Sequence, residues 1–310
     1  MNRKYFVNAK SFFSKVSGSE TAISALQNSS QHLYQREDAE HLEFNSDLTS
    51  LKGWGGEISG GKRSGKFRLV GGLDWRSPGI DLNDVGYMRQ ADYINQDLIM
   101  VYQVNKPKGL LLNYNIKLDQ KHNWSYGGEN IKDELDSHLR FRLKNYWMFD
   151  LDLDRIYNEI DTRQLRGGPS LRIDGNTSTE FFIQTNSSKD LFLAGGADFT
   201  NYDDKITFKN EYDFMIQWMV SNSFTISSRT GFSNEIDNSQ YVFQKVVNGK
   251  REYIVGKIDR KTIYTTLRAE YFITPELSLQ YYGSPYASTG KYLDYRKVDE
   301  SKSRLSLIHI

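Results

Sequence analysis

The sequence predicts an all-β protein, an antiparallel transmembrane β-barrel of the outer-membrane type, and two observations carry that prediction. The first is the length of the two-faced strands, best seen at residues 205–220. A strand in a soluble sheet usually has about 5 or 6 residues, whereas a tilted strand that crosses a bilayer needs ~9–11. One side meeting lipid and the other meeting water inside a barrel would explain the alternation. The apolar side holds Ile206, Phe208, Tyr212, Phe214, Ile216, Trp218 and Val220, with Asn210 among them.

The second observation is that short and long connections alternate along the chain. We expect short turns near residues 107, 145, 187, 222 and 275. Longer polar segments lie at 77–96, 121–134, 158–168 and 234–261, with a shorter loop at 201–204. Outer-membrane barrels have short turns at one end and longer loops at the other, whereas a soluble Greek-key sandwich has no reason to alternate in this way.

Composition excludes several classes of function. The 310 residues hold 40 Lys and Arg against 39 Asp and Glu, so the net charge of +1 gives no reason to expect a nucleic-acid partner. A mean hydropathy of −0.63 without a long apolar run excludes a transmembrane helix, but it is compatible with a barrel whose lumen and loops are polar. The absence of cysteine excludes thiol catalysis, disulfides and thiolate metal sites.

The two ends of the sequence indicate a fragment of an exported protein. Residues 1–7 include basic residues without the apolar run that a signal peptide requires. Residues 305–310 follow a charged stretch abruptly, and we expect them to be a non-native tail. The expectation is one β-barrel domain at 1–304 with about twelve strands and without the strands that close the barrel. Such a fragment has unpaired edges, so we expect that it does not insert alone as a stable closed barrel.

The N-terminal third begins with the weakest pattern. The mixed segment 22–36 could be a short helix or a strand with loops, and for residues 1–46 we expect β-structure. The glycine-rich run at 51–58 predicts a strand whose missing side chains allow another segment of the chain to approach closely. After a turn at 60–65, residues 66–76 alternate cleanly and predict a further strand, which ends at Ser77-Pro78-Gly79.

The rest of the chain repeats this alternation of two-faced strands and turns. Strands are expected at 97–105, 110–118, 139–143, 147–154, 171–173, 180–185, 191–200, 263–273 and 277–281. A three-residue turn at 144–146 sets Arg140 opposite Asp150. A turn at 221–223 likewise sets Trp218 opposite Ile226. Asn248-Gly249 is a type I′ hairpin signal, so we expect segment 234–261 to project as a two-stranded ribbon.

The first candidate site is the loop at 81–92 with the strand end before it. Its charged side chains could bind sugar by stacking and bidentate hydrogen bonds, or the loop could fold inward as a constriction. The alternative is that Arg89 and the aspartates only tie the loop to the barrel wall. The candidate residues are Trp75, Arg76, Asp81, Asp84, Arg89 and Asp92.

The second candidate is a charge ladder on the polar sides of neighbouring strands. Carboxylates at every second residue of a strand lie in a row roughly 6.5–7 Å apart, which suits neither a calcium cage nor a catalytic pair. We expect luminal ion pairs that polarise the lumen and could select ions or small solutes. The residues are Arg140, Arg142, Asp150, Asp152, Asp154, Asp213 and Arg229.

No pattern in the sequence predicts catalysis. The five histidines are scattered without metal-ligand spacing, and no Ser-His-Asp pattern, phosphate loop or dinucleotide fingerprint occurs. We therefore expect no metal, no cofactor and no enzymatic activity.

Three stretches carry a family resemblance: Gly53-Trp54-Gly55-Gly56, the segment 75–92, and Gly283-Ser284-Pro285-Tyr286 with the residues up to Tyr292. Over residues 5–304 the chain resembles the uncharacterised outer-membrane β-barrel domain that typically follows a family-nine-like carbohydrate-binding module in large surface proteins of Gram-negative bacteria. The resemblance implies an outer-membrane location, lipid as a partner, and carbohydrate as a partner of an upstream module.

Together these observations favour a non-enzymatic pore or surface scaffold of the outer membrane, associated with carbohydrate binding or uptake. One alternative is a membrane anchor for a surface hydrolase whose catalytic domain lies outside this sequence. The other is a soluble β-sandwich or adhesin module, which conflicts with the long two-faced strands.

Overall fold

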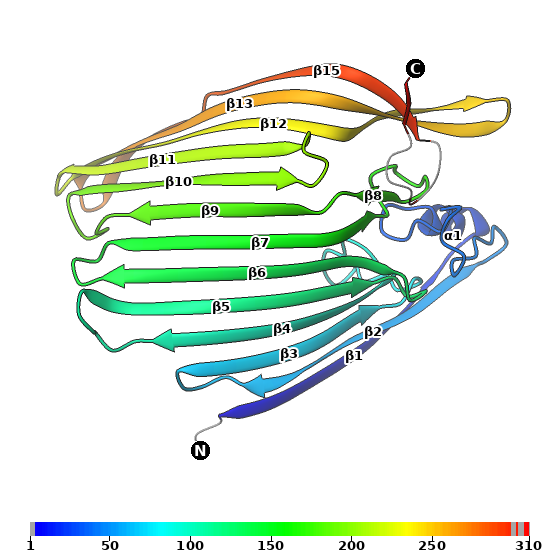
Figure 1. Ribbon diagram of the computed structural model, residues 1–310, viewed down its shortest axis with the longest axis horizontal. Helices are drawn as coiled ribbons and strands as arrows, with labels where there is room; N and C mark the ends of the chain where they lie inside the picture. The colour runs from blue at the N-terminus through cyan, green and yellow to red at the C-terminus, as the bar shows by residue number, and fades with distance from the viewer. Residues whose placement is uncertain (1–3, 299–301, 303–306, 310) are drawn as a thin grey trace.

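The chain folds into one large antiparallel sheet, and of the residues that the structure describes 67% are strand and 3% are helix (Figure 1). The computed structural model describes residues 4–298, 302 and 307–309. The helix is α1 (Glu20–Gln27). The strands are β1 (Tyr5–Ser17), β2 (Ser50–Lys62), β3 (Phe67–Arg76), β4 (Tyr93–Val104), β5 (Leu111–Trp124), β6 (Asn130–Leu143), β7 (Met148–Asp161), β8 (Leu171–Ile173), β9 (Asn176–Gln184), β10 (Leu191–Tyr202), β11 (Phe208–Ser221), β12 (Phe224–Val247), β13 (Lys250–Thr274), β14 (Leu277–Gly283), β15 (Tyr286–Val298) and β16 (Leu307–His309).

The strands follow chain order across the sheet, which confirms the antiparallel all-β prediction. The path runs from β1 to β7, continues with β9 to β13, and ends with β15 and β16. In the described part of the chain the sheet is open, because β1 pairs only with β2 and does not meet β15. The sheet has more strands than the sequence predicted, and it is a single sheet rather than the two packed sheets of a sandwich.

The two ends of the sheet differ as the alternating connections predicted. The turn end, on the left in Figure 1, carries tight turns such as 144–147 and 222–223, whereas the loop end carries α1 and the longer connections. The prediction of a long loop at 121–134 was wrong, because β5 and β6 continue through most of it and leave only 125–129 between them.

Strand register sorts the side chains into an apolar face and a polar face. On β11, Phe214 lies opposite Gly195 and Thr230, and Trp218 lies opposite Leu191 and Ile226. The pairing of Trp218 with Ile226 confirms the predicted turn. Side chains of the apolar face are exposed across the sheet: Trp54 is 50% exposed, Phe181 51% and Phe214 54%.

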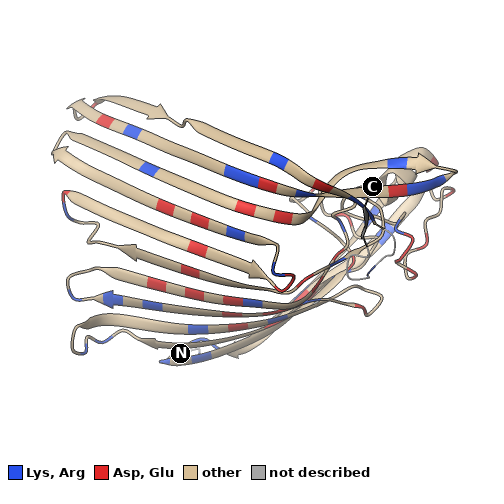
Figure 2. Cartoon of the chain, turned by 45° about the horizontal axis from the view of Figure 1, so that its top comes forward, with Lys and Arg blue, Asp and Glu red and all other residues tan. Residues whose placement is uncertain are grey.

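The polar face carries rows of charge that run along the strands (Figure 2). Within the described residues no second sheet packs on either face, and the helix α1 lies against β2. The large apolar side chains named above therefore have no second sheet over them.

The hairpin of β12 and β13 extends beyond its neighbours at the loop end (Figure 1). Its strands remain paired up to Val247 and Lys250. Asn248 and Gly249 both have positive φ, 50° and 78°, as a type I′ turn requires. The predicted ribbon is confirmed. Tyr253 and Val255, in the outer part of the ribbon, pack on Leu165 of the loop before β8 and on Leu171 of β8.

Residues 20–49 form a cap at the loop end, and here the prediction of β-structure at 22–36 was wrong. Ser19 caps α1, because its hydroxyl accepts a hydrogen bond from Ala22 N at 3.2 Å. Ile23 and Gln27 form the buried side of the helix. The short length and mixed composition of α1 gave no helical period in the sequence.

No helix among the described residues has the length and apolar composition needed to cross a membrane.

Close approach of two backbones explains the glycine at position 53, as the glycine-rich run predicted. A Cβ at Gly53 would lie 2.1 Å from Ile80 N, and a Cβ at Gly79 would lie 2.2 Å from Lys52 O. The loop after β3 thus crosses the polar face of β2 in direct backbone contact. Ser14 Oγ accepts a hydrogen bond from Asp81 N at 2.9 Å and fixes the crossing to β1.

Candidate functional site

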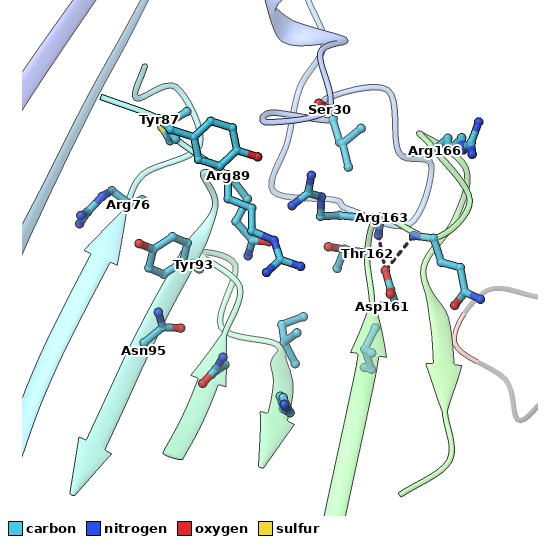
Figure 3. A pocket seen from close by; sticks show the side chains of 18 of the residues that line it. Ser30, Arg76, Tyr87, Arg89, Tyr93, Asn95, Asp161, Thr162, Arg163 and Arg166 are labelled. Atoms are coloured by element: carbon cyan, nitrogen blue, oxygen red, sulfur yellow. Dashed lines mark hydrogen bonds between the residues drawn. The ribbon is translucent and has the colours of Figure 1, made fainter. Parts of the chain in front are cut away.

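A cavity of about 1160 Å³ lies on the polar face at the loop end (Figure 3). Its floor is formed by the ends of β3 to β7, through residues such as Tyr93, Asn95 and Asn123. Its walls come from the cap, from the loop before β4 and from the loop after β7. Three segments far apart in sequence therefore enclose one space.

The lining is rich in cations and amides. The lining contains two carboxylates, Glu159 and Asp161, and five cationic side chains, those of Arg76, Arg89, Arg163, Arg166 and Lys132. The amide side chains in the lining are those of Asn28, Gln90, Asn95, Asn123 and Gln164, and the tyrosines are Tyr87 and Tyr93. Guanidinium groups suit bidentate pairing with anions, and amides can donate to or accept from hydroxyl groups.

Arg76 is held by aromatic stacking rather than by an ion pair. Its guanidinium lies 4.3 Å from the ring centroid of Phe12 and 5.8 Å from that of Tyr93. Arg76 Nη1 also donates to Trp75 O at 2.9 Å. Stacking of this kind fixes the planar group while leaving its other N–H donors available.

Arg163 is positioned by a turn that Asp161 organises. Asp161 Oδ1 accepts hydrogen bonds from the backbone N of Arg163 and of Gln164, each at 2.7 Å (Figure 3). Such a carboxylate-capped turn fixes the local backbone. In Figure 3 the side chains of Arg89 and Arg163 extend into the cavity from opposite walls. Arg166 instead stacks on Tyr241, 4.9 Å from its ring centroid.

The structure divides the first predicted group of site residues between different roles. Arg76 and Arg89 line the cavity. Trp75 belongs to the apolar face, where its ring packs over Gly56. Asp81 Oδ1 accepts from Asn83 N within the loop, and Asp84 is exposed.

Asp92 ties the loop to the cap, which is the structural role considered for the aspartates. Its carboxylate accepts from Arg36 Nη2 at 3.1 Å, from His41 Nε2 at 2.7 Å and from Tyr126 N at 3.0 Å. Both side chains of the Arg36 pair are buried, with 6% of Arg36 and 8% of Asp92 exposed. Asp92 has a positive φ of 59°, a conformation that Asp and Asn tolerate better than most residues.

Burial shifts two titrating groups in the cap. Burial lowers the pKa of His32, although hydrogen bonding to Ile80 O at 2.9 Å and the charge of Asp81 oppose the shift. Burial, together with the negative charge of Asp92, raises the pKa of Tyr34 to about 12. Both groups are therefore uncharged at neutral pH in the folded cap.

The charge ladder is present in part. Arg140 pairs with Asp150 across β6 and β7 as predicted, with Nε donating to Oδ1 at 2.6 Å and Nη2 donating to Oδ2 at 3.1 Å. Arg229 Nε donates to Asp213 Oδ1 at 2.7 Å, on the predicted diagonal.

Three members of the ladder depart from the expected pairing. Asp152 lies opposite His138, whose Nδ1 is 2.5 Å from Asp152 Oδ1, and Asp154 lies opposite Asp136. The register places Met148 opposite Arg142, so of the two arginines on β6 only Arg140 meets an aspartate, and the next two aspartates face a histidine and a like charge. Arg142 Nη2 donates to Met148 Sδ at 3.7 Å instead of to a carboxylate.

Sequence reasoning missed the loop after β7 as part of the site. Arg163 and Arg166 stand beside Gly167-Gly168 in a long connection, and that concentration of arginine was an available signal. No group of three or more His, Cys, Asp and Glu suited to a metal ion occurs among the residues that the structure describes.

A family model described as Domain of unknown function (DUF5916) matches residues 8–306. No curated protein matches the chain.

Proposed function

The chain belongs to the family described as Domain of unknown function (DUF5916), and we propose that it forms the wall of an outer-membrane β-barrel. In this proposal the protein is a non-enzymatic pore or surface scaffold that handles carbohydrate. Its apolar face meets lipid, its polar face meets water, and its loop end carries the ligand cavity.

The single observation that carries the proposal is the uncovered apolar face. Soluble monomers rarely expose contiguous apolar patches larger than a few hundred Å². Here large apolar side chains are exposed on strands from one edge of the sheet to the other, for example Phe13, Leu69, Ile116, Phe181, Phe214 and Ile263. Lipid is the solvent in which such a face is stable, provided that the backbone is paired within the sheet.

Two further features support handling of a polar solute. The polar face carries paired charges along its strands, such as Arg140 with Asp150. The cavity at the loop end is lined by amide and tyrosine side chains, and these groups suit a ligand with many hydroxyl groups. The association with carbohydrate also follows from the family resemblance.

Single cysteines test the orientation of the two faces, because the chain has no native cysteine. Phe214→Cys and Asp213→Cys are a matched pair, adjacent on β11 and on opposite faces. A second pair on β5 is Ile116→Cys and Lys117→Cys. In membranes of a Gram-negative cell that expresses the full-length protein containing this chain, we expect a charged maleimide to modify the cysteines at 213 and 117 and to leave those at 214 and 116 largely unmodified.

The readout separates lipid from other environments. A polarity-sensitive thiol dye attached after solubilisation and reconstitution into vesicles should show blue-shifted emission at 214 and 116 only, with quenching by lipid-borne quenchers. A protein that remains soluble without detergent, with equal maleimide reactivity on both faces, would refute the proposal.

A further inference from the structure

We propose that the cavity at the loop end binds an acidic oligosaccharide, whose carboxylate or sulfate groups pair with Arg89 and Arg163. This inference rests on the proposed handling of carbohydrate and adds the charge of the sugar. The first support is the imbalance of charge in the lining. Among the described residues, Arg76, Arg89 and Arg163 form no ion pair, whereas the carboxylate of Asp161 already accepts two backbone N–H groups.

The remaining charges of the lining do not neutralise these arginines. Lys132 lies opposite Glu159 of the lining across β6 and β7 and pairs with Glu134 below the cavity, so its charge is matched by these carboxylates. Arg166 is stacked on Tyr241. The upper part of the cavity is consequently cationic, and an anion entering it gains charge-assisted hydrogen bonds.

The type and placement of the cations favour a ligand with planar or multidentate anionic groups. A guanidinium presents its N–H donors in a rigid fork that matches a carboxylate or a sulfate, whereas an ammonium acts as a point charge. Arg89 and Arg163 reach the cavity from different loops on opposite walls (Figure 3). A ligand with two anionic groups can therefore bridge the walls.

The space between the arginines suits a sugar rather than a simple anion. The cavity of about 1160 Å³ is somewhat larger than the range for drug-sized ligands, ~300–1,000 Å³, and leaves room for more than one sugar ring. Five amide side chains and two tyrosines line it, and they provide partners for hydroxyl groups and flat surfaces for sugar rings.

The polar face below the cavity sets the lower limit of the site. A second cavity further along β6 and β7 is lined by four carboxylates, those of Glu134, Asp136, Asp152 and Asp154, together with Lys117, Lys132 and His138. The carboxylates outnumber the lysines and disfavour an anion there, so the ligand is held at the loop end, above these residues.

Binding to size-matched probes tests the inference on the membrane-reconstituted protein. The probes are a hexamer of galacturonate, a hexamer of galactose, and inorganic phosphate, each titrated by calorimetry at low and high salt. We expect the galacturonate hexamer to bind at least about tenfold more tightly than the galactose hexamer, a difference of about 1.4 kcal/mol. Added salt should reduce the difference.

Substitutions assign the binding to the two arginines. Arg89→Gln and Arg163→Gln should each weaken binding of the galacturonate hexamer about tenfold and leave the galactose hexamer unchanged, and Arg89→Lys should restore only part of the loss. Arg251→Gln is the matched control, because Arg251 is exposed at the ribbon and does not line the cavity.

The outcomes separate this inference from the proposed function. Equal binding of both hexamers would overturn the acidic ligand and leave the carbohydrate function standing. Binding of phosphate alone, or an unchanged affinity in both glutamine variants, would also overturn the inference. If neither hexamer binds while the cysteine labelling shows a lipid-facing wall, the proposed membrane wall is supported and the proposed carbohydrate ligand is refuted.

Discussion

Replacing Asp92 with Asn should release the cap from the loop before β4. Asp92 accepts three hydrogen bonds and pairs with Arg36, and both side chains are buried. Asn keeps the shape and the tolerance of positive φ, so the substitution removes the charge and one of the two acceptor oxygens. Arg36 then loses its ionic partner and keeps its 3.2 Å hydrogen bond to Ser170 Oγ.

The magnitude follows from the loss of one partner of a buried ion pair. Such a loss costs about 3–5 kcal/mol, and the isosteric Asn should give the lower end of this range. A cost of about 3 kcal/mol raises the population of the opened cap by roughly 100-fold, because each 1.4 kcal/mol is a factor of ten.

Trypsin provides the assay, since its cleavage site after Arg36 is buried in the folded cap. When opening and closing are fast relative to cleavage, the cleavage rate follows the population of the open form. We expect cleavage after Arg36 to accelerate by about two orders of magnitude in Asp92→Asn. Asp84→Asn is the control, because Asp84 lies exposed in the same loop, and its effect should stay within ~0.5 kcal/mol. Equal cleavage rates in the two variants would refute the reasoning.

Three other predictions follow from the fold and the polar face. Burial lowers the pKa of His32, so below pH ~6.5 the unfolded cap binds a proton that the folded cap does not bind. The stability of the cap, measured by hydrogen exchange, should therefore fall as the pH drops from about 6.5 to the lowered pKa. The variant His32→Gln should not show this pH dependence. Gly53→Ala places a Cβ 2.1 Å from Ile80 N and should destabilise the protein by at least ~1–3 kcal/mol in denaturant titrations, whereas Gly86→Ala, with nothing within 4 Å, should not. In planar bilayers, Asp150→Asn combined with Asp152→Asn should reduce cation preference if the ladder lines a conducting lumen; an unchanged reversal potential would remove the ladder from permeation.

The sequence predicted the strands where the two faces differ in polarity. On β11 the period of two was visible because one side is apolar along its length, and the short turn after it fixed the pairing of Trp218 with Ile226. Toward the loop end both faces become polar, so the strands in 121–134 and 234–261 carry no alternation although backbone pairing continues. A period of two in polarity appears only where the two faces of a strand meet different environments, and it disappears where both faces are polar.

The site could be predicted only in its local parts. Arg76 and Arg89 stood out because they belong to one charged loop and the strand end before it. Their association with Arg163 depends on the order of five strands and on contacts of the cap, and no local pattern encodes such distances. Asp92 and Asp84 look alike in the sequence, but Asp92 pairs with Arg36 from a distant part of the chain and Asp84 is exposed. No local pattern distinguishes them.

The long ribbon of β12 and β13 acts as a lever on the cavity. Tyr253 and Val255 of β13 pack on Leu165 and Leu171, in and just after the loop that carries Arg163. Tyr253 lies opposite Gln244, so at ~3.3 Å per residue only roughly 10 Å of the ribbon extends beyond this contact to Val247. A lateral force at the Asn248-Gly249 tip, for example from an antibody against a tag inserted there, is therefore transmitted as torque to one wall of the cavity. Contact at the tip of the ribbon can thereby change how the arginines are spaced.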